Sequence, residues 1–183
     1  MTDLHLKLRK PSPKWLGPAE KLYCDAFPAE ERRPFDHFLL EPDDKLRGPY
    51  LHIILLSKGI TDKFAGLLTT WQFDDFVYIE HLATMPGLRG SGIGTSVIEG
   101  LRGRVGCPLV LEAEHPSADN PMAARRLAFY DRLGFDVIDS GYIQPPYGPG
   151  LPEVPLRLLA DSTDLDAAEV ARTLHREVYG VTC

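Results

Sequence analysis

The chain has 183 residues, of which 44% are hydrophobic and 25% are charged, and its formal net charge is −6 at pH 7. This composition is typical of a globular protein and excludes a disordered, collagen-like or disulfide-built chain. The sequence has no long basic stripe, so we expect neither nucleic acid nor a membrane as a partner. The cysteines lie far apart, without metal-ligand spacing, and we see no apolar leader or spanning segment. We therefore expect a cytoplasmic protein that binds no metal.

Hydrophobic patterns divide the chain into strands and helices. Alternation or short apolar runs predict strands over 4–8, 50–57, 64–73, 76–84, 109–113, 135–143 and 154–159. Apolar stripes predict helices over 14–26, 35–40, 91–101, 120–134 and 165–179. Asn120 before Pro121 is typical of a helix start, and Gly134 is a typical helix stop. This order, without a repeat or a linker, predicts one α/β domain over residues 1–183.

A glycine-rich loop follows the predicted strand 76–84 and leads into a predicted helix. Gly90, Gly92 and Gly94 let the backbone turn sharply and come close to a ligand. The helix start adds unpaired N–H groups and a partial positive charge, which favour a phosphate group. The spacing fits neither the dinucleotide-binding pattern G-x-G-x-x-G nor the Walker A pattern. An ordinary strand–helix turn is the alternative interpretation.

The same loop resembles a motif of a known enzyme family. Arg89, Gly92 and Gly94 match the R/Q-x-x-G-x-G/A motif of the GNAT family of N-acetyltransferases. Segment 126–135 is similar to that family's F-Y-x-x-x-G-F signature. The resemblance covers about residues 4–159 and implies a mixed, mostly antiparallel sheet of about 6–7 strands flanked by helices. The helix at about 163–180 would be an addition to this core.

The resemblance implies that acetyl-CoA is the co-substrate. The loop N–H groups would hold its pyrophosphate, and the end of strand 76–84 would hydrogen-bond the pantetheine and the acetyl carbonyl. Strands 76–84 and 109–113 would separate to admit it. Asn120 is either a further cofactor contact or simply the helix N-cap. The other implied cofactor-binding residues are Leu82, Ala83, Thr84, Arg89, Gly90, Ser91, Gly92, Ile93, Gly94, Thr95 and Tyr130.

Amide formation from a thioester needs an acid for the departing thiolate and a base for the acceptor ammonium. Tyr130 is the candidate acid, because its helix position turns it inward and the family uses a tyrosine at this motif position. A core aromatic residue is the alternative. Glu80 is the candidate base and His81 its rival, since alternation places these neighbours on opposite faces of the strand. A structural ion pair at Glu80 is the alternative.

The acceptor site is expected to be acidic and aromatic. Glutamates alternate with apolar residues at the end of strand 109–113, where they could hold a cationic amine; exposed strand-end charges are the alternative. The Pro/Gly-rich segment 144–152 could form a wall of this site or a contact in a homodimer. The candidate substrate-binding residues are Glu80, Glu112, Glu114, Tyr142 and Tyr147.

The residues leave two functions open. The first is an acyltransferase that moves the acetyl group of acetyl-CoA to a primary amine by direct attack in a ternary complex. The acceptor could then be a small molecule, a peptide N-terminus or a lysine. The second is a non-catalytic acyl-CoA-binding module with a regulatory or partner-binding role.

Overall fold

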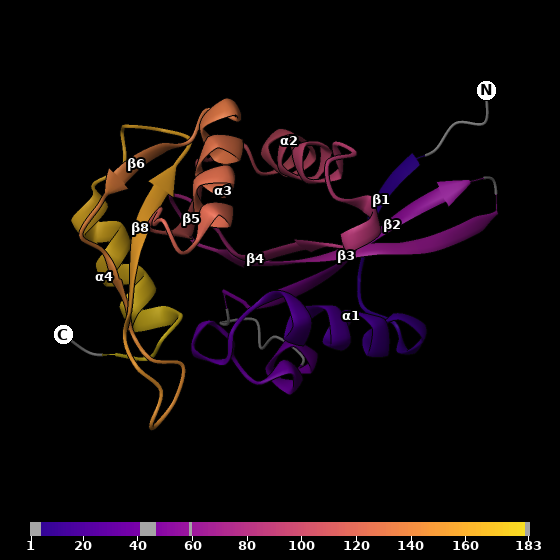
Figure 1. Cartoon of the computed structure of the whole chain (residues 1–183), viewed down its shortest axis with the longest axis horizontal. Helices are drawn as coiled ribbons and strands as arrows, with labels where there is room; N and C mark the ends of the chain where they lie inside the picture. The colour runs from indigo at the N-terminus through magenta and orange to yellow at the C-terminus, as the bar shows by residue number, and fades with distance from the viewer. Residues whose placement is uncertain (1–4, 41–46, 59, 182–183) are drawn as a thin grey trace.

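A computed structural model describes residues 5–40, 47–58 and 60–181 of the chain (Figure 1). The strands are β1 (His5–Arg9), β2 (Tyr50–Lys58), β3 (Thr61–Gln72), β4 (Val77–Thr84), β5 (Leu109–Glu114), β6 (Asp136–Asp139), β7 (Ile143–Gln144) and β8 (Val154–Ala160). The α-helices are α1 (Pro13–Ala26), α2 (Ile93–Val105), α3 (Pro121–Arg132) and α4 (Ala167–Glu177). Short 3-10 helices lie at η1 (Ala29–Glu31), η2 (Phe35–Leu39) and η3 (Pro86–Leu88).

The strands form one 8-stranded sheet in the order β1-β2-β3-β4-β5-β8-β6, with β7 paired separately to β8. Neighbours are antiparallel except β4 and β5, the one parallel pair among the described residues. The predicted fold class, a mixed and mostly antiparallel sheet flanked by helices, is confirmed. The additional helix near the C-terminus is present as α4.

Two predicted elements differ from the structure. The strand expected over 135–143 is split into β6 and β7, and the segment between them turns through Gly141, whose N–H bonds the Asp139 carboxylate at 2.8 Å. A side chain that bonds the backbone two residues later favours such a turn over a continuous strand. The helix expected over 35–40 is the 3-10 helix η2. Leu4, the predicted start of the first strand, lies outside the described residues.

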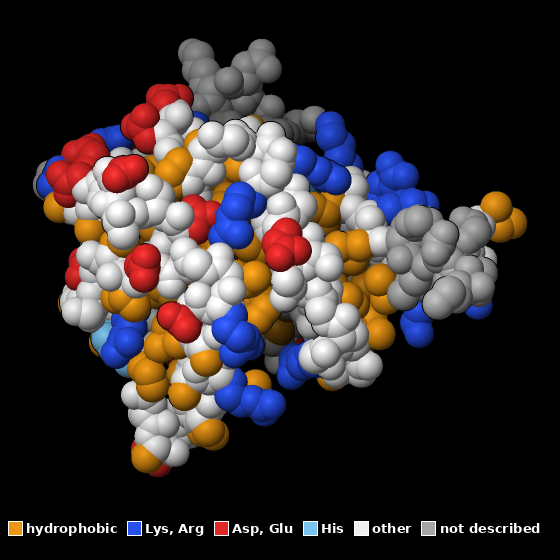
Figure 2. All heavy atoms as spheres, turned by 90° about the horizontal axis from the view of Figure 1, so that it is seen from above, with side chains coloured by type: hydrophobic (Ala, Val, Ile, Leu, Met, Phe, Trp, Pro, Cys, Tyr) orange, Lys and Arg blue, Asp and Glu red, His pale blue; other side chains and the backbone are white. Residues whose placement is uncertain are grey.

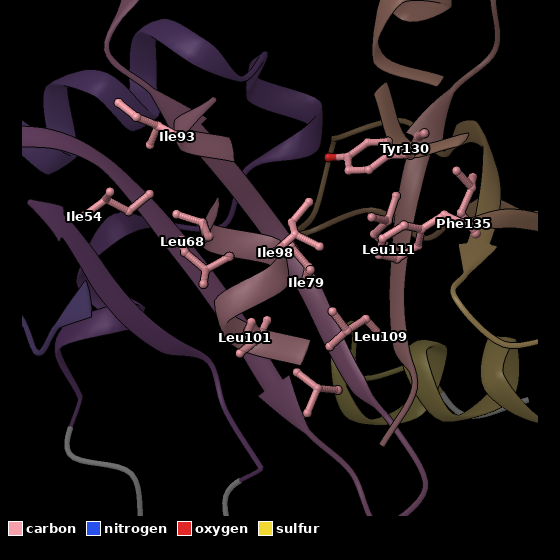
Figure 3. Close-up of a cluster of buried hydrophobic side chains, with 14 of the residues drawn as sticks. Ile54, Leu68, Ile79, Ile93, Ile98, Leu101, Leu109, Leu111, Tyr130 and Phe135 are labelled. Atoms are coloured by element: carbon pink, nitrogen blue, oxygen red, sulfur yellow. The ribbon is translucent and has the colours of Figure 1, made fainter. Parts of the chain in front are cut away.

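Helices cover both faces of the sheet (Figure 1). On one face, α2 and α3 bury a cluster that includes Ile98, Leu111 and Tyr130 (Figure 3). On the other face, α1 packs on β2, β3 and β4 through residues such as Leu22, while α4 packs near β5 and β8 through Leu174. The second face therefore has two helical covers, one over β2, β3 and β4 and the other near β5 and β8.

Strand β4 contains a β-bulge at Glu80. Consecutive residues of β3 pair with Ile79 and His81, so Glu80 has no partner on β3. The extra residue turns Glu80 and His81 to the same side, where their side chains approach to 3.9 Å, and places Ile79 and Leu82 in one cluster under α2 and α3. The predicted placement of Glu80 and His81 on opposite faces is wrong, because strict alternation requires a strand without a bulge.

The parallel strands β4 and β5 stay paired for only a short distance. Their ladder runs from Val77 opposite Leu109 to Ile79 opposite Leu111. Strand β4 continues to Thr84 and β5 to Glu114, and these described segments have no pairing with each other. The sheet thus opens between the two strands, as the resemblance to the GNAT family implies.

Helix α2 contains a glycine at a position where a side chain would fit. Gly100 is exposed, and a Cβ atom added there would meet no atom within 4 Å. We expect Gly100→Ala to raise the free energy of unfolding by about 0.5–1 kcal/mol, because alanine loses less backbone entropy in a helix. Urea unfolding should show the gain. Gly106→Ala is the control: Gly106 follows the same helix with φ 66°, where alanine is strained, so this variant should lose stability. A gain in both variants would contradict the argument.

Candidate active site

The glycine-rich loop enters α2 through two glycines in the left-handed region. Gly90 has φ 76° and Gly92, the N-cap of α2, has φ 83°. A Cβ atom added at either position would meet no atom within 4 Å, so both glycines face open space. A ligand could therefore approach the backbone closely here, next to the free N–H groups of the first turn of α2.

The loop borders a cavity of about 350 Å³. We call it the donor cavity, after the acyl donor that the sequence resemblance implies. Seen from the side of α2 and α3, Lys and Arg side chains surround a hollow in the surface (Figure 2). The arginines of the donor cavity are Arg89, Arg126 and Arg132, so its wall is cationic although the whole chain is acidic. Its other lining residues are Leu82, Thr84, Leu88, Gly90, Gly92, Ile93, Gly94, Thr95, Phe129 and Tyr130.

A second cavity, of about 400 Å³, lies where β4 and β5 separate, and we call it the acceptor cavity. Its wall carries the carboxylates of Asp25, Glu31, Glu80, Glu112 and Glu114. The two cavities adjoin, because both are lined by Leu82, Thr84, Arg89, Arg126 and Tyr130. A cationic cavity thus meets an acidic one at the opening of the sheet.

Tyr130 lies at the junction of the two cavities. Its ring is buried against Phe129 and Phe135, with ring centroids 5.2 and 5.7 Å away, and its hydroxyl points away from Phe135 (Figure 3). Burial raises the pKa of Tyr130 to about 12, partly offset by the nearby Arg126. The phenol therefore keeps its proton at neutral pH, as a proton donor must.

Glu80 is buried in a network of donors. Its Oε1 accepts hydrogen bonds from Arg33 Nε at 2.8 Å, Arg33 Nη2 at 2.5 Å and the Tyr147 hydroxyl at 3.0 Å. Its Oε2 accepts one from Trp71 Nε1 at 3.1 Å. Burial alone would raise the pKa of Glu80, but the Arg33 guanidinium, His81 and these hydrogen bonds reverse that effect and leave the pKa below its usual value.

His81 lines the acceptor cavity with both ring nitrogens engaged. Nδ1 lies 3.0 Å from the Thr69 hydroxyl, and Nε2 lies 2.9 Å from the Glu31 carbonyl oxygen. A neutral ring that donates from Nε2 and accepts at Nδ1 satisfies both contacts. Burial lowers the pKa of His81, although the Glu80 carboxylate acts in the opposite direction. The ring therefore has no free lone pair for a ligand in this arrangement.

The remaining acidic residues of the cavity have fewer partners. Glu112 Oε2 accepts a hydrogen bond from the Tyr179 hydroxyl at 2.8 Å, and the hydroxyls of Tyr142 and Tyr78 also stabilise its charge, but burial raises its pKa to about 7. Burial and the charge of Glu114 raise the pKa of Glu31 to about 7 as well. Glu114 itself is paired with Arg126 at 2.6 Å. The acceptor cavity therefore holds more carboxylates than counter-charges, and it favours a cation.

The structure places the other predicted site residues less uniformly. Ala83 lines the acceptor cavity, whereas the Ser91 hydroxyl donates to the Leu88 carbonyl at 2.6 Å. Asn120 caps α3, since its side chain accepts from the Ala123 N–H at 3.2 Å, and it lines neither cavity. Tyr147 lines the acceptor cavity; Tyr142 is buried behind it. The cap interpretation of Asn120 is thus confirmed.

Comparison with known proteins identifies the family. The profile of the "Acetyltransferase (GNAT) family" matches residues 17–135. The chain belongs to the GNAT acetyltransferase family. A solved "Putative acetyltransferase from GNAT family" from Bacteroides thetaiotaomicron is 33% identical, with a TM-score of 0.78 over 96% of this chain and 99% of that one.

Two further relatives are more distant. "Putative acetyltransferase YjbC" of Bacillus subtilis is 33% identical over 64 residues, which span 35% of this chain and only 33% of that protein. An Arabidopsis thaliana protein solved with the bisubstrate analogue CoA-Ac-MVNAL has a TM-score of 0.51 at 17% identity, over 86% of this chain and 98% of that one. The second likeness shows the fold alone.

Two residues that shape the acceptor cavity, Arg33 and Tyr179, were not predicted from the sequence. Arg33 lies in a loop 47 residues before Glu80 and reaches it as the ion partner. Tyr179 follows α4, and its hydroxyl donates to Glu112 Oε2 at 2.8 Å. Neither belongs to a motif, and a partner so far along the chain leaves no local pattern. A fully buried carboxylate nevertheless requires a cationic partner, so an arginine near the cavity could have been sought.

Two features, a metal-binding cluster and a membrane-spanning helix, are absent from the part of the chain that the structure describes. No cluster of three or more His, Cys, Asp or Glu side chains is arranged to hold a metal ion in residues 5–40, 47–58 and 60–181. Within the same ranges, no helix has the length and apolar character needed to span a membrane.

The Arg33–Glu80 ion pair gives a pH-dependent stability prediction. We expect Arg33→Gln to lower the free energy of unfolding by about 3–5 kcal/mol near pH 7.5, because it leaves a buried carboxylate unpaired. Glu80 has a depressed pKa in the native protein, so its contribution is present at neutral pH and fades in acid. In the variant, burial raises that pKa, Glu80 binds a proton on mild acidification, and the deficit should narrow toward pH 5.

Urea unfolding of both proteins at the two pH values measures this difference. Lys21→Gln is the control, because it breaks the exposed Lys21–Asp25 pair and should leave the unfolding midpoint unchanged at both pH values. A deficit for Arg33→Gln that is small, or that grows in acid, would show that the pair is not the buried ionic contact described above.

Proposed function

We propose that the chain is an N-acetyltransferase that moves the acetyl group of acetyl-CoA to a primary amine by direct attack in a ternary complex. The observation that carries this proposal is the shared wall of the donor and acceptor cavities, with Tyr130 in both. Two ligands in adjoining cavities can meet without a covalent enzyme intermediate, so direct transfer is the simplest chemistry.

The donor cavity fits the phosphates of acetyl-CoA. Its arginines and the N–H groups at the start of α2 both favour anions, and the open space over Gly90 and Gly92 lets a pyrophosphate reach the backbone. The edge of β4 beyond Ile79 is unpaired toward β5 and offers backbone groups to an extended pantetheine arm. The Arabidopsis thaliana neighbour was solved with an analogue that contains CoA, which agrees with this assignment.

The acceptor cavity fits an amine. Its surplus of carboxylates attracts an ammonium ion, and Tyr147 supplies an aromatic face beside them. A small molecule, a peptide N-terminus and a lysine side chain all present this group. The amine nitrogen would attack the acetyl carbonyl carbon, and the Tyr130 hydroxyl would give its proton to the departing thiolate as the carbon–sulfur bond breaks.

Calorimetry and a thiol-release assay together test the proposal. We expect acetyl-CoA to bind in isothermal titration and a panel of amines to accelerate the release of free CoA thiol from it. The panel should contain diamines, an amino sugar, amino acids and short peptides. Tight binding without amine-dependent release across the panel would instead favour a non-catalytic acyl-CoA-binding module.

Tyr130→Phe should lower turnover by about 100-fold, because it removes the proton donor for the thiolate and little else. Acetyl-CoA affinity should stay within about twofold of the native value, since the ring and its packing remain. Thiol release and isothermal titration measure the two quantities. Tyr50→Phe, on β2 and outside both cavities, is the matched control and should leave turnover unchanged. Native turnover in Tyr130→Phe would remove this residue from the mechanism.

Gly92→Val should abolish most acetyl-CoA binding. The branched Cβ blocks the close approach of the pyrophosphate, and φ 83° strains any side chain at this position. We expect the dissociation constant measured by titration to rise at least about 30-fold, the loss of roughly two charge-assisted hydrogen bonds. Gly87→Val, in η3 just before the loop and with free space around its Cβ, should bind normally. Equal affinities would mean that the loop does not hold the phosphates.

A further inference from the structure

A further cavity, of about 520 Å³, lies beside the acceptor cavity, and we call it the side groove. It is bounded by one face of α1, the start of β3 and the short helix η3. Its lining is mostly carbon, and the apolar residues in it are Pro18, Leu22, Ala26, Phe64, Met85 and Pro86. A concave apolar surface of this size is typical of a site for an apolar ligand.

The side groove is open because of the residues on this face of α1. Its α1 residues, at positions 17, 18, 21, 22, 25 and 26, recur at helical spacing and therefore share one face. Gly17 has no side chain, and a Cβ atom added there would meet no atom within 4 Å. Phe64 stacks on Trp15 at 6.2 Å between ring centroids, which fixes the aromatic wall, while Met85 is 37% exposed. The groove therefore presents apolar surface that a ligand could cover.

The side groove continues from the acceptor cavity. Asp25, Ala26 and Arg89 line both, whereas among the described residues Arg89 alone lines the side groove and the donor cavity. Helix α1 packs on the face of the sheet opposite to α2 and α3, which border the donor cavity (Figure 1). From Ala26 back to Gly17 the helix rises by about 13 Å, at about 1.5 Å per residue. A ligand with its amine in the acceptor cavity can therefore extend along the groove past Ala26.

The chemistry of the side groove selects a hydrocarbon group and not a peptide backbone. A bound peptide strand needs hydrogen-bond partners for its N–H and C=O groups. The wall formed by α1 offers few, because helical backbone groups bond each other, Pro18 has no N–H, and Lys21 and Asp25 bond each other at 2.7 Å. A hydrocarbon group needs no such partners and gains free energy on leaving water.

Resting on the proposed acetyl transfer, we propose that the side groove binds the apolar tail of the acceptor, so that the enzyme prefers primary amines that carry a hydrocarbon tail. The ammonium lies among the carboxylates of the acceptor cavity, and the tail passes Asp25 and Ala26 into the groove. Gly17 and Met85 then determine specificity for the tail and touch no reacting atom.

Amines of increasing length test the side groove in the thiol-release assay. Octylamine should have a KM at least about 30-fold below that of butylamine at similar kcat, because each methylene buried in the groove lowers KM by about three- to fourfold. Diaminoheptane, with an amine at each end, matches octylamine in length but brings a second charge into the groove, so it should lose most of this gain.

The same amines separate this inference from the proposed function. Equal KM values for butylamine and octylamine, with both acetylated, would overturn the role of the side groove and leave the proposed function standing. No thiol release with any amine would refute the proposed function. Calorimetric titration, in which octylamine should bind more tightly than butylamine, tests the groove without turnover.

Substitutions in the groove test its residues directly. Gly17→Leu fills the groove from α1 and should raise the KM of octylamine by about 10-fold with kcat retained, a loss of roughly two buried methylenes. Met85→Gln keeps the length of the side chain but makes it polar, and it should raise the same KM by at least about threefold. Gly103→Leu is the matched control, because Gly103 is an exposed glycine of α2 that lines none of the three cavities and has free space around its Cβ.

The variants also decide between the two substrates of the transfer. A native KM for octylamine in both Gly17→Leu and Met85→Gln, or an equal rise in Gly103→Leu, would overturn the proposal. Octanoyl-CoA with butylamine is the remaining arm. If Gly17→Leu impairs the use of octanoyl-CoA and leaves octylamine unaffected, the groove holds the acyl chain of the donor and the proposal is wrong.

Discussion

The separation of β4 and β5 is the constraint on which the site depends. Parallel strands share evenly spaced hydrogen bonds, and ending them after Ile79 and Leu111 leaves two strand segments with free backbone groups facing each other. Such groups must be satisfied, and a ligand that lies between the strands can do so. The same opening joins the two faces of the sheet, which lets α3 contribute Tyr130 and the chain after α4 contribute contacts to Glu112.

The bulge at Glu80 lies beside this opening and has a related effect. An extra residue in β4 turns two polar side chains, Glu80 and His81, to the side covered by α1 and α4. Arg33 then joins β4 to the rest of that side: it bonds Glu80, contacts the ring of Tyr147 at 5.2 Å and donates to the Val178 carbonyl at 3.3 Å. A buried ion pair adds little net stability compared with apolar packing, but it fixes geometry because breaking it is costly.

Local signals predicted the features of this chain that are local in origin. The glycine-rich entry to α2, the Asn120 cap and the succession of strands up to β5 all follow from neighbouring residues, and the structure agrees with them. The bulge does not follow, because a strand with an inserted residue still reads as alternating on either side of it. Arg33 and Tyr179 act across 47 and 67 residues of sequence, where side-chain pairing is decided by tertiary packing alone.

The donor and acceptor cavities therefore differ in how they are encoded. The donor cavity depends on a left-handed backbone conformation that favours glycine, at Gly90 and Gly92, and its lining lies wholly within the family match of residues 17–135. The acceptor cavity depends on side chains, and several of them, Gln144, Tyr147 and the supporting Tyr179, lie beyond that match. Side chains on these late segments can change without disturbing the glycine-rich loop, because no backbone hydrogen bond joins the two among the described residues. In this chain, Tyr179, which follows α4, adds a contact to Glu112 on the wall of the acceptor cavity from outside the segment that the family profile matches.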